Sequence, residues 1–226
     1  MLRLVSSMAP KQLLADLAAQ WQRSTGLAVS ITSVGGLDAA RRVREGEAFD
    51  AVVLASDAID SLINGGYAVP GSKVDLARSA VAVAVKAGEP VPDISTESAL
   101  RRTIEAASGI GYSTGPSGVA LVKLLQRWGI LDALGSRVVQ VPPGIPVGAL
   151  VARGEVALGF QQLSELMHLE GITVVGVLPG SASITTIFSA AVCVASTQRE
   201  ELAGLLAFMA SNDVTKLKLQ NGMQAP

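Results

Sequence analysis

Short runs of apolar residues alternate along the chain with stretches whose apolar residues recur every three or four positions. The first pattern predicts buried strands and the second predicts amphipathic helices. The expected strands are 2–6, 27–32, 50–54, 79–85, 110–112, 138–141, 156–160, 174–178 and 187–195. Helices are expected between them, and we expect the last helix, near 200–210, to finish the fold. This alternation is typical of an α/β protein with parallel sheets and crossover helices.

Glycine, proline and serine residues mark where the elements begin and end. Pro10 suits the first turn of the first helix, and Gly26 ends that helix. Ser95 is placed to cap the helix expected over 96–107. No obvious linker and no internal repeat divides the chain, so any second lobe is expected to be inserted within the first rather than appended to it.

Composition favours a folded protein with a large core. The chain has 226 residues, of which 49% are hydrophobic and 16% are charged, and this is not the composition of a disordered chain. The formal net charge of −1 gives no indication of nucleic acid or an anionic membrane as a partner. No uncharged apolar run reaches about 18 residues, so we expect no transmembrane helix.

The sequence contains no motif for a metal site or for a common cofactor, and we expect neither. The single cysteine, Cys193, excludes an internal disulfide and a cysteine-built metal site, and its apolar surroundings predict a buried, inert thiol. The single histidine, His168, excludes a histidine metal cluster and lies in an ordinary helical stretch. There is no Gly-x-Ser-x-Gly elbow and no dinucleotide-binding Gly-x-Gly-x-x-Gly after a strand.

The start of the chain leaves two locations open. Met1 is followed at once by the first expected strand, without a basic and apolar leader in front of it. If a signal peptide has been removed, we expect a periplasmic protein, and otherwise a cytoplasmic one.

Polar loops follow several strands and open helices. The four loops are residues 6–7, residues 33–36, residues 113–118, and Ser164 beside Gln161 and Gln162. Ligands of open parallel sheets bind beyond the carboxyl ends of the strands, where helix N-termini present unpaired N–H groups. Serine before a helix is most often only a cap. The loop 113–118 is more specific because it is long and rich in donors, and it lacks the lysine of a phosphate-binding loop.

Three stretches resemble the molybdate-binding proteins of ABC importers. They are Leu-Val-Ser-Ser-Met-Ala at 4–9, Phe-Asp-Ala-Val-Val-Leu-Ala-Ser-Asp at 49–57, and Gly-Ala-Leu through Leu-Gly at 148–159. The resemblance covers nearly the whole chain, although each motif is short. It implies a two-lobed type II periplasmic-binding-protein fold of class α/β, with mixed, mostly parallel sheets and flanking helices. The first lobe would comprise 1–80 and 186–226, the second would be inserted at 81–185, and two crossing segments would lie near 78–82 and 183–190.

The resemblance also implies ligand residues at the cleft between the lobes. It places Ser7 and Ser33 as contacts of the first lobe, with backbone N–H groups from Gly35 and Gly36. On the second lobe the corresponding loop carries Ser113, Thr114, Ser117 and Gly118.

Two departures from the family pattern concern the ligand. Gln162 stands where the family has a ligand-contacting tyrosine, and Ile145-Pro146-Val147 replaces its Asp-Val-Arg stretch. We interpret this as a site for an organic polycarboxylate rather than a bare tetrahedral oxyanion. Arg78, just before a crossing strand, is a candidate carboxylate clamp, with a solvated surface arginine as the alternative.

Two functions therefore compete. The first is a solute-binding protein, expected to be a monomer, that captures a small anion and delivers it to an ABC permease. The second is an enzyme similar to aconitate isomerase, which shifts a proton and a double bond in a tricarboxylate on the same scaffold. A ligand-sensing DNA-binding protein would need a helix-turn-helix, and no segment remains for one, so no nucleic acid is expected as a partner.

Overall fold

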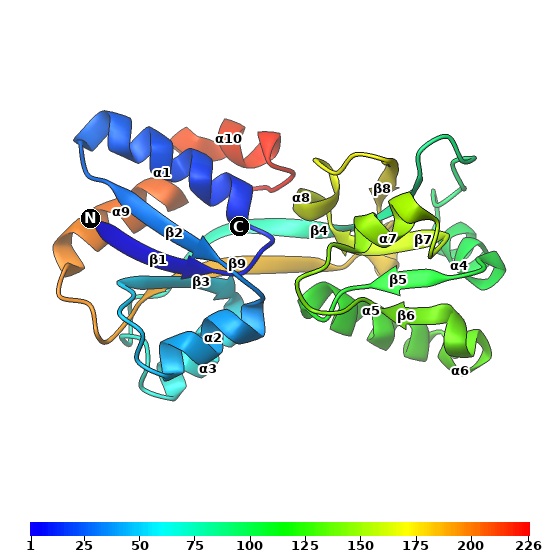
Figure 1. Cartoon of the computed structure of the whole chain (residues 1–226), viewed down its shortest axis with the longest axis horizontal. Coiled ribbons are helices and arrows are strands. Elements are labelled where there is room, and N and C mark those ends of the chain that lie inside the picture. The colour runs from blue at the N-terminus through cyan, green and yellow to red at the C-terminus, as the bar shows by residue number, and fades with distance from the viewer. The chain divides into compact units, whose positions relative to one another are not determined.

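The computed structural model describes all of residues 1–226 and confirms the α/β class (Figure 1). The chain forms two compact units, Met1–Ser79 with Thr186–Pro226, and Ala80–Thr185. Two strands, β4 (Val74–Lys86) and β9 (Thr185–Val192), run across the two boundaries between these units.

The first unit is a mixed sheet with helices on both faces (Figure 1). Its strand order is β2-β1-β3-β9-β4, where β1 (Leu2–Ser6), β2 (Val29–Ser33) and β3 (Ala51–Ala55) are parallel and β9 is antiparallel. The helices are α1 (Lys11–Thr25), α2 (Gly36–Arg44), α3 (Ser56–Asn64), α9 (Arg199–Ala210) and α10 (Thr215–Gln220). Because side chains alternate along a strand, Leu4 packs in the core under α1 and α9, and Val5 packs in the core under α2 and α3.

The second unit is built in the same way. Its strand order is β4-β7-β5-β6, with β8 paired to the other side of β4. The strands are β5 (Ile110–Tyr112), β6 (Val138–Gln140), β7 (Leu158–Gln162) and β8 (Ile172–Val177). The helices are α4 (Glu97–Ala106), α5 (Pro116–Arg127), α6 (Leu131–Leu134), α7 (Val147–Arg153) and α8 (Leu163–Leu166). The core under α4 and α5 and the smaller cores under α7 and α8 lie on opposite faces of this sheet.

Most elements lie where the hydrophobic pattern predicts them, although several bounds shift by a few residues. Gly26 ends α1 as predicted, with φ 76° in the left-handed region that glycine tolerates. Thr96, rather than Ser95, caps α4, because its Oγ1 accepts a hydrogen bond from the N–H of Ala99 at 3.1 Å. Strand β4 begins at Val74, earlier than predicted, and helices α6 and α10 were not predicted.

None of the helices combines the length and the apolar character that crossing a membrane requires. Cys193 is buried, and burial together with the charge of Asp50 raises the pKa of its thiol to about 12. The thiol therefore stays protonated at neutral pH, in agreement with the inert core residue that the sequence predicts.

Candidate ligand-binding site

The first unit gathers its candidate residues at one edge of its sheet. Strands β1, β2 and β3 are parallel, and their register places Ser6 opposite both Ser33 and Val53. The carboxyl ends of the three strands therefore meet at this edge, where the loops toward α1, α2 and α3 begin. The hydroxyls of Ser6 and Ser33 are hydrogen-bonded at 2.8 Å. Ser6 is fully buried and fixes the half-buried Ser33, a supporting role that the predicted residues did not include.

Ser7 holds the least satisfied polar atom of this edge. Its N–H donates to the carbonyl of Val53 at 3.0 Å, but its buried Oγ has no hydrogen-bond partner within the protein. Leaving a buried hydroxyl unpaired costs about 1–3 kcal/mol, so such an atom is a candidate ligand contact.

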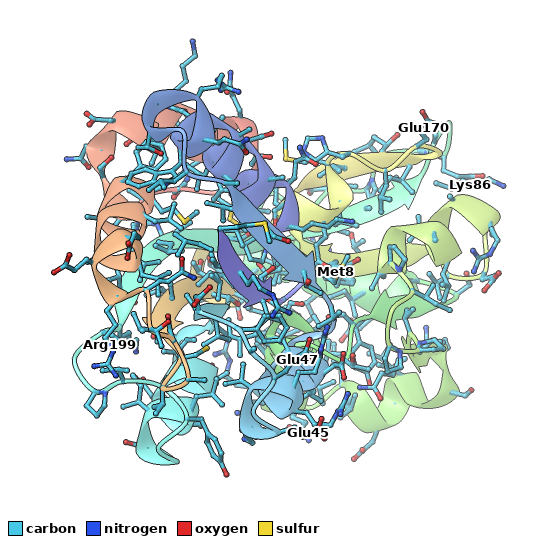
Figure 2. The ribbon with its side chains drawn as sticks, turned by 60° about the vertical axis from the view of Figure 1, so that its left-hand side comes forward. Met8, Glu45, Glu47, Lys86, Glu170 and Arg199 are labelled. Carbon is cyan, nitrogen blue, oxygen red and sulfur yellow. The ribbon has the colours of Figure 1, made fainter.

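Gly36 lies beside Ser7, where it begins the nine-residue helix α2. A Cβ added at Gly36 would lie 3.6 Å from the Cβ of Ser7. The N-terminus of α2 and the hydroxyl of Ser7 are therefore neighbours, and both favour an anion. Two exposed apolar side chains border this group, Met8 directly after Ser7 (Figure 2) and Leu37 directly after Gly36.

The second unit gathers its candidates in the loop before α5. The hydroxyls of Ser113 and Ser117 are hydrogen-bonded at 3.0 Å, and the N–H of Gly115 donates to Ser113 Oγ at 3.3 Å. Gly118 fits tightly against this loop, because an added Cβ would lie 1.8 Å from the carbonyl oxygen of Ser113. Thr114 belongs to the same loop. Only glycine at 118 allows the loop to close over the start of α5.

Gln162 ends β7 on the same face of the sheet as α5. Tyr112, the last residue of β5, is in register with Phe160 of β7, so the loop that starts at Ser113 follows the neighbouring strand end. Phe160 packs in the core under α5, and Gln162, two residues later, points to the same face. The second unit therefore brings together Gln162 with Ser113, Thr114, Ser117 and Gly118.

Gln161 points to the opposite face and joins two helices there. Its Oε1 accepts from the N–H of Val147, the first residue of α7, at 2.9 Å, and its Nε2 donates to Glu165 Oε1 at 2.8 Å. Because Pro146 has no N–H and that of Val147 is engaged, neither can donate to a ligand. This role of Gln161 was not predicted from the sequence. Two adjacent glutamines at a strand end were a signal for it, because consecutive strand residues point to opposite faces of the sheet.

Burial raises the pKa of Glu165 from 4.5 to about 7, while the hydrogen bond from Gln161 acts in the opposite direction. A carboxyl group with such a pKa exchanges its proton near neutral pH. Glu165 is therefore the one candidate acid–base group that the structure adds to the predicted residues.

Arg78 is engaged with the C-terminal segment. Its backbone pairs in both directions with that of Gln224, and its Nε donates to Gln224 Oε1 at 3.2 Å. The carboxylate clamp remains a prediction. Two arginines of α2 form surface ion pairs, Arg41 with Glu45 and Arg42 with Glu47.

Two surface hollows of the second unit contain none of the predicted residues. One, of about 370 Å³, is lined by α5 and residues 181–184, and the other, of about 520 Å³, lies beside Lys86 and Thr103.

The donors described above are hydroxyls, an amide and helix N–H groups. No three His, Cys, Asp or Glu side chains are grouped so that they could hold a metal ion. The chemistry that this donor set offers is hydrogen bonding to anionic oxygens.

Comparison with known proteins agrees with this architecture. Among curated proteins, an aconitate isomerase from Pseudomonas sp is 37% identical over 214 residues, which is 92% of this chain and 82% of that protein.

Solved structures show the same fold at low identity. The periplasmic molybdate-binding protein of Azotobacter vinelandii superposes with a TM-score of 0.83 at 21% identity, covering 100% of both chains. The substrate-binding domain of a putative molybdenum ABC transporter from Clostridium difficile gives a TM-score of 0.79 at 16% identity, covering 100% of this chain and 98% of that one.

The family model for bacterial extracellular solute-binding proteins matches residues 2–224, nearly the whole chain. This match, the curated relative and the shared fold agree with one another. The chain belongs to the bacterial extracellular solute-binding protein family and has the fold of the periplasmic binding proteins.

Proposed function

We propose that this protein binds a small organic polycarboxylate, of the size of citrate or aconitate, and delivers it to an ABC permease. The observation that carries the proposal is the buried, unpartnered hydroxyl of Ser7 beside the N-terminus of α2. A neutral hydroxyl and a helix N-terminus together favour a desolvated anion. We propose that the donors around Gln162 in the second unit bind the same ligand, so that one anion contacts both units.

The surroundings of the donors favour an organic ligand over an inorganic one. Each group of donors is bordered by exposed apolar side chains, Met8 and Leu37 in the first unit and Val119 in the second. A carbon skeleton can bury these side chains, whereas a compact oxyanion cannot. Pro146 and Gln161 also remove the first donors of α7, which leaves the second unit with the wider loop 113–118.

Titration calorimetry with citrate, cis-aconitate, trans-aconitate, molybdate and tungstate tests the ligand class. We expect at least one tricarboxylate to bind and to raise the melting temperature, because ligand at a hundred times its Kd adds about 2.7 kcal/mol to the free energy of unfolding. Tight molybdate binding without heat from any tricarboxylate would contradict the proposal and show that the ligand is an oxyanion.

A second candidate function is the isomerisation of a tricarboxylate on the same scaffold. It is favoured by the 37% identical aconitate isomerase. Shifting a double bond requires one proton to leave a carbon and another to be returned two carbons away, so the enzyme would need an acid–base group within reach of the ligand. Proton NMR of trans-aconitate with the protein decides between the functions: formation of the cis isomer supports the enzyme, and unchanged spectra support the receptor.

We also propose a periplasmic location and a monomeric receptor that meets its permease there. Osmotic-shock fractionation of cells that carry the native gene tests the location, and release with periplasmic markers is the expected result. Retention with cytoplasmic markers would contradict the transport role. Light scattering of the purified protein tests the monomer.

A further inference from the structure

Glu165, whose side chain is partly buried, is the end of a series of hydrogen bonds that joins three elements of the second unit. The series runs from Glu165 in α8 through the amide of Gln161 in β7 to the N–H of Val147 at the start of α7, with distances of 2.8 and 2.9 Å. Gln161 is only 4% exposed, so water does not compete for its amide. The series therefore fixes the carboxyl end of β7 against α7.

No cation compensates the carboxylate of Glu165. Helix α7 carries one charged residue, Arg153, at its far end; β7 and β8 carry none, and α8 carries only Glu165 itself. Lys86 is the last residue of β4, which runs antiparallel to β7, so it lies toward the start of β7 and away from Gln162. His168 and Glu170, which follow α8, are exposed, and Figure 2 shows Glu170 at the surface. Burial and the Gln161 hydrogen bond alone therefore set its pKa near neutrality.

These hydrogen bonds involve Gln161, the residue directly before the proposed ligand donor Gln162. Gln161 and Gln162 are adjacent at the end of β7 and point to opposite faces, the first toward α7 and the second toward α5. An anion bound at Gln162 would bring negative charge close to Glu165. A like charge favours the protonated form of a carboxyl group, and more so where burial lowers the dielectric constant.

We propose that Glu165 is a positioning residue that holds the end of β7 through Gln161 and takes up a proton when an anion binds at Gln162. This inference rests on the proposed function, because it requires a ligand at the donors of the second unit. The hydrogen bond from Gln161 survives protonation, since the protonated group still offers an acceptor oxygen. Proton uptake thus neutralises the partly buried charge without releasing β7.

The test is titration calorimetry with trans-aconitate, whose own carboxyl groups stay ionised over the range used, from about pH 6 to about pH 8.5. Buffers of different ionisation enthalpy report the protons taken up. We expect uptake by the unmodified protein and an affinity that falls above about pH 7, by at most about tenfold per pH unit. In Glu165→Gln, which keeps an acceptor for Gln161 but cannot titrate, uptake should vanish and the affinity should become independent of pH.

Two further variants separate titration from positioning. Glu170→Gln, the exposed control in the same unit, should behave like the unmodified protein. Glu165→Leu, which removes the acceptor, should bind about tenfold more weakly even at the low end of the range. Undiminished proton uptake in Glu165→Gln, or unchanged affinity in Glu165→Leu, overturns the inference.

Failure of the proposed function has a different signature. If trans-aconitate does not bind but molybdate does, the polycarboxylate proposal is wrong and the same titrations are made with molybdate. Proton uptake that Glu165→Gln abolishes then still supports the positioning role, and its absence in the unmodified protein refutes that role.

Discussion

At the scale of single residues, the loop before α5 depends on one glycine. Gly118→Ala would place a Cβ 1.8 Å from the carbonyl oxygen of Ser113, so the loop has to move away from the start of α5. We expect a loss on the order of 2–4 kcal/mol in the free energy of unfolding, measured by urea titration, and loss of ligand binding. Gly115→Ala is the matched control, because its Cβ would lie 3.6 Å from Ser113 Oγ, an ordinary contact. Equal stability of the two variants would contradict this account.

Glu165 should make stability depend on pH. Its pKa is 4.5 when unfolded and about 7 when folded, so between these values the folded state binds more protons than the unfolded state. Stability is therefore fully present below about pH 4.5 and falls as the pH rises to about 7. Glu165→Gln lacks this loss.

We expect Glu165→Gln to exceed the unmodified protein by on the order of 1–3 kcal/mol at pH 8 and to equal it near pH 4. Urea unfolding at both pH values measures the difference. Glu170→Gln, at an exposed position, should change stability by less than about 0.5 kcal/mol at either pH. A constant difference between Glu165→Gln and the unmodified protein would show that Glu165 titrates normally.

At the scale of elements, Asp50 ties the start of β1 to the segment that follows β9. Its carboxylate accepts from the N–H of Arg3 at 2.8 Å, from Ser196 Oγ at 2.8 Å and from Gln198 Nε2 at 3.3 Å. The residue is 8% exposed, so these bonds form where water is largely excluded. Three donors therefore converge on one buried carboxylate, which links β1 to the segment that follows β9.

Asp50→Ala leaves those donors without an acceptor and should lower the free energy of unfolding by on the order of 2–4 kcal/mol. Chemical denaturation measures the loss. Asp132→Ala, at an exposed position of α6, is the control and should stay within about 0.5 kcal/mol of the unmodified protein. If both variants unfold at the same denaturant concentration, the hydrogen bonds of Asp50 do not stabilise the link between β1 and the segment that follows β9.

At the scale of the whole molecule, Ser7 and Gln162 belong to different units, so their effects on binding report whether one ligand contacts both. Each change to alanine should weaken tricarboxylate binding by roughly 1–3 kcal/mol. If both side chains contact one anion, the double variant should depart from the sum of the single effects by more than about 0.5 kcal/mol.

The matched measurement is the free energy of unfolding without ligand, where the two changes should add within about 0.5 kcal/mol because the two residues lie in different units. Ser24→Ala and Gln126→Ala, at exposed helix positions, control for general effects of the substitutions. Additive effects on binding would argue against a shared ligand.

Local pattern was sufficient for much of this molecule. Strand and helix positions follow from the spacing of apolar residues, because a side chain's face is set by the period of its own element. Gly26 could be predicted as a helix end because left-handed φ is a local property. The donor loops could be predicted because serine and glycine at strand ends are visible without any knowledge of neighbours, and the family resemblance extended that prediction to Gln162.

Other features depend on contacts between residues distant in the sequence, and only the tertiary structure decided them. Helix α10 was missed because its short polar pattern is stabilised from outside: Lys218 is buried there and donates to the carbonyl of Ala210, at the end of α9. Arg78 meets Gln224 only because the C-terminal segment returns to β4. Gln161 and Gln162 are identical in sequence terms, yet one secures α7 and the other faces α5, because the helices that cover each face of β7 come from different parts of the chain. The pKa of Glu165 follows from the same cause, since burial is produced by the packing of the whole unit and not by the residues beside it.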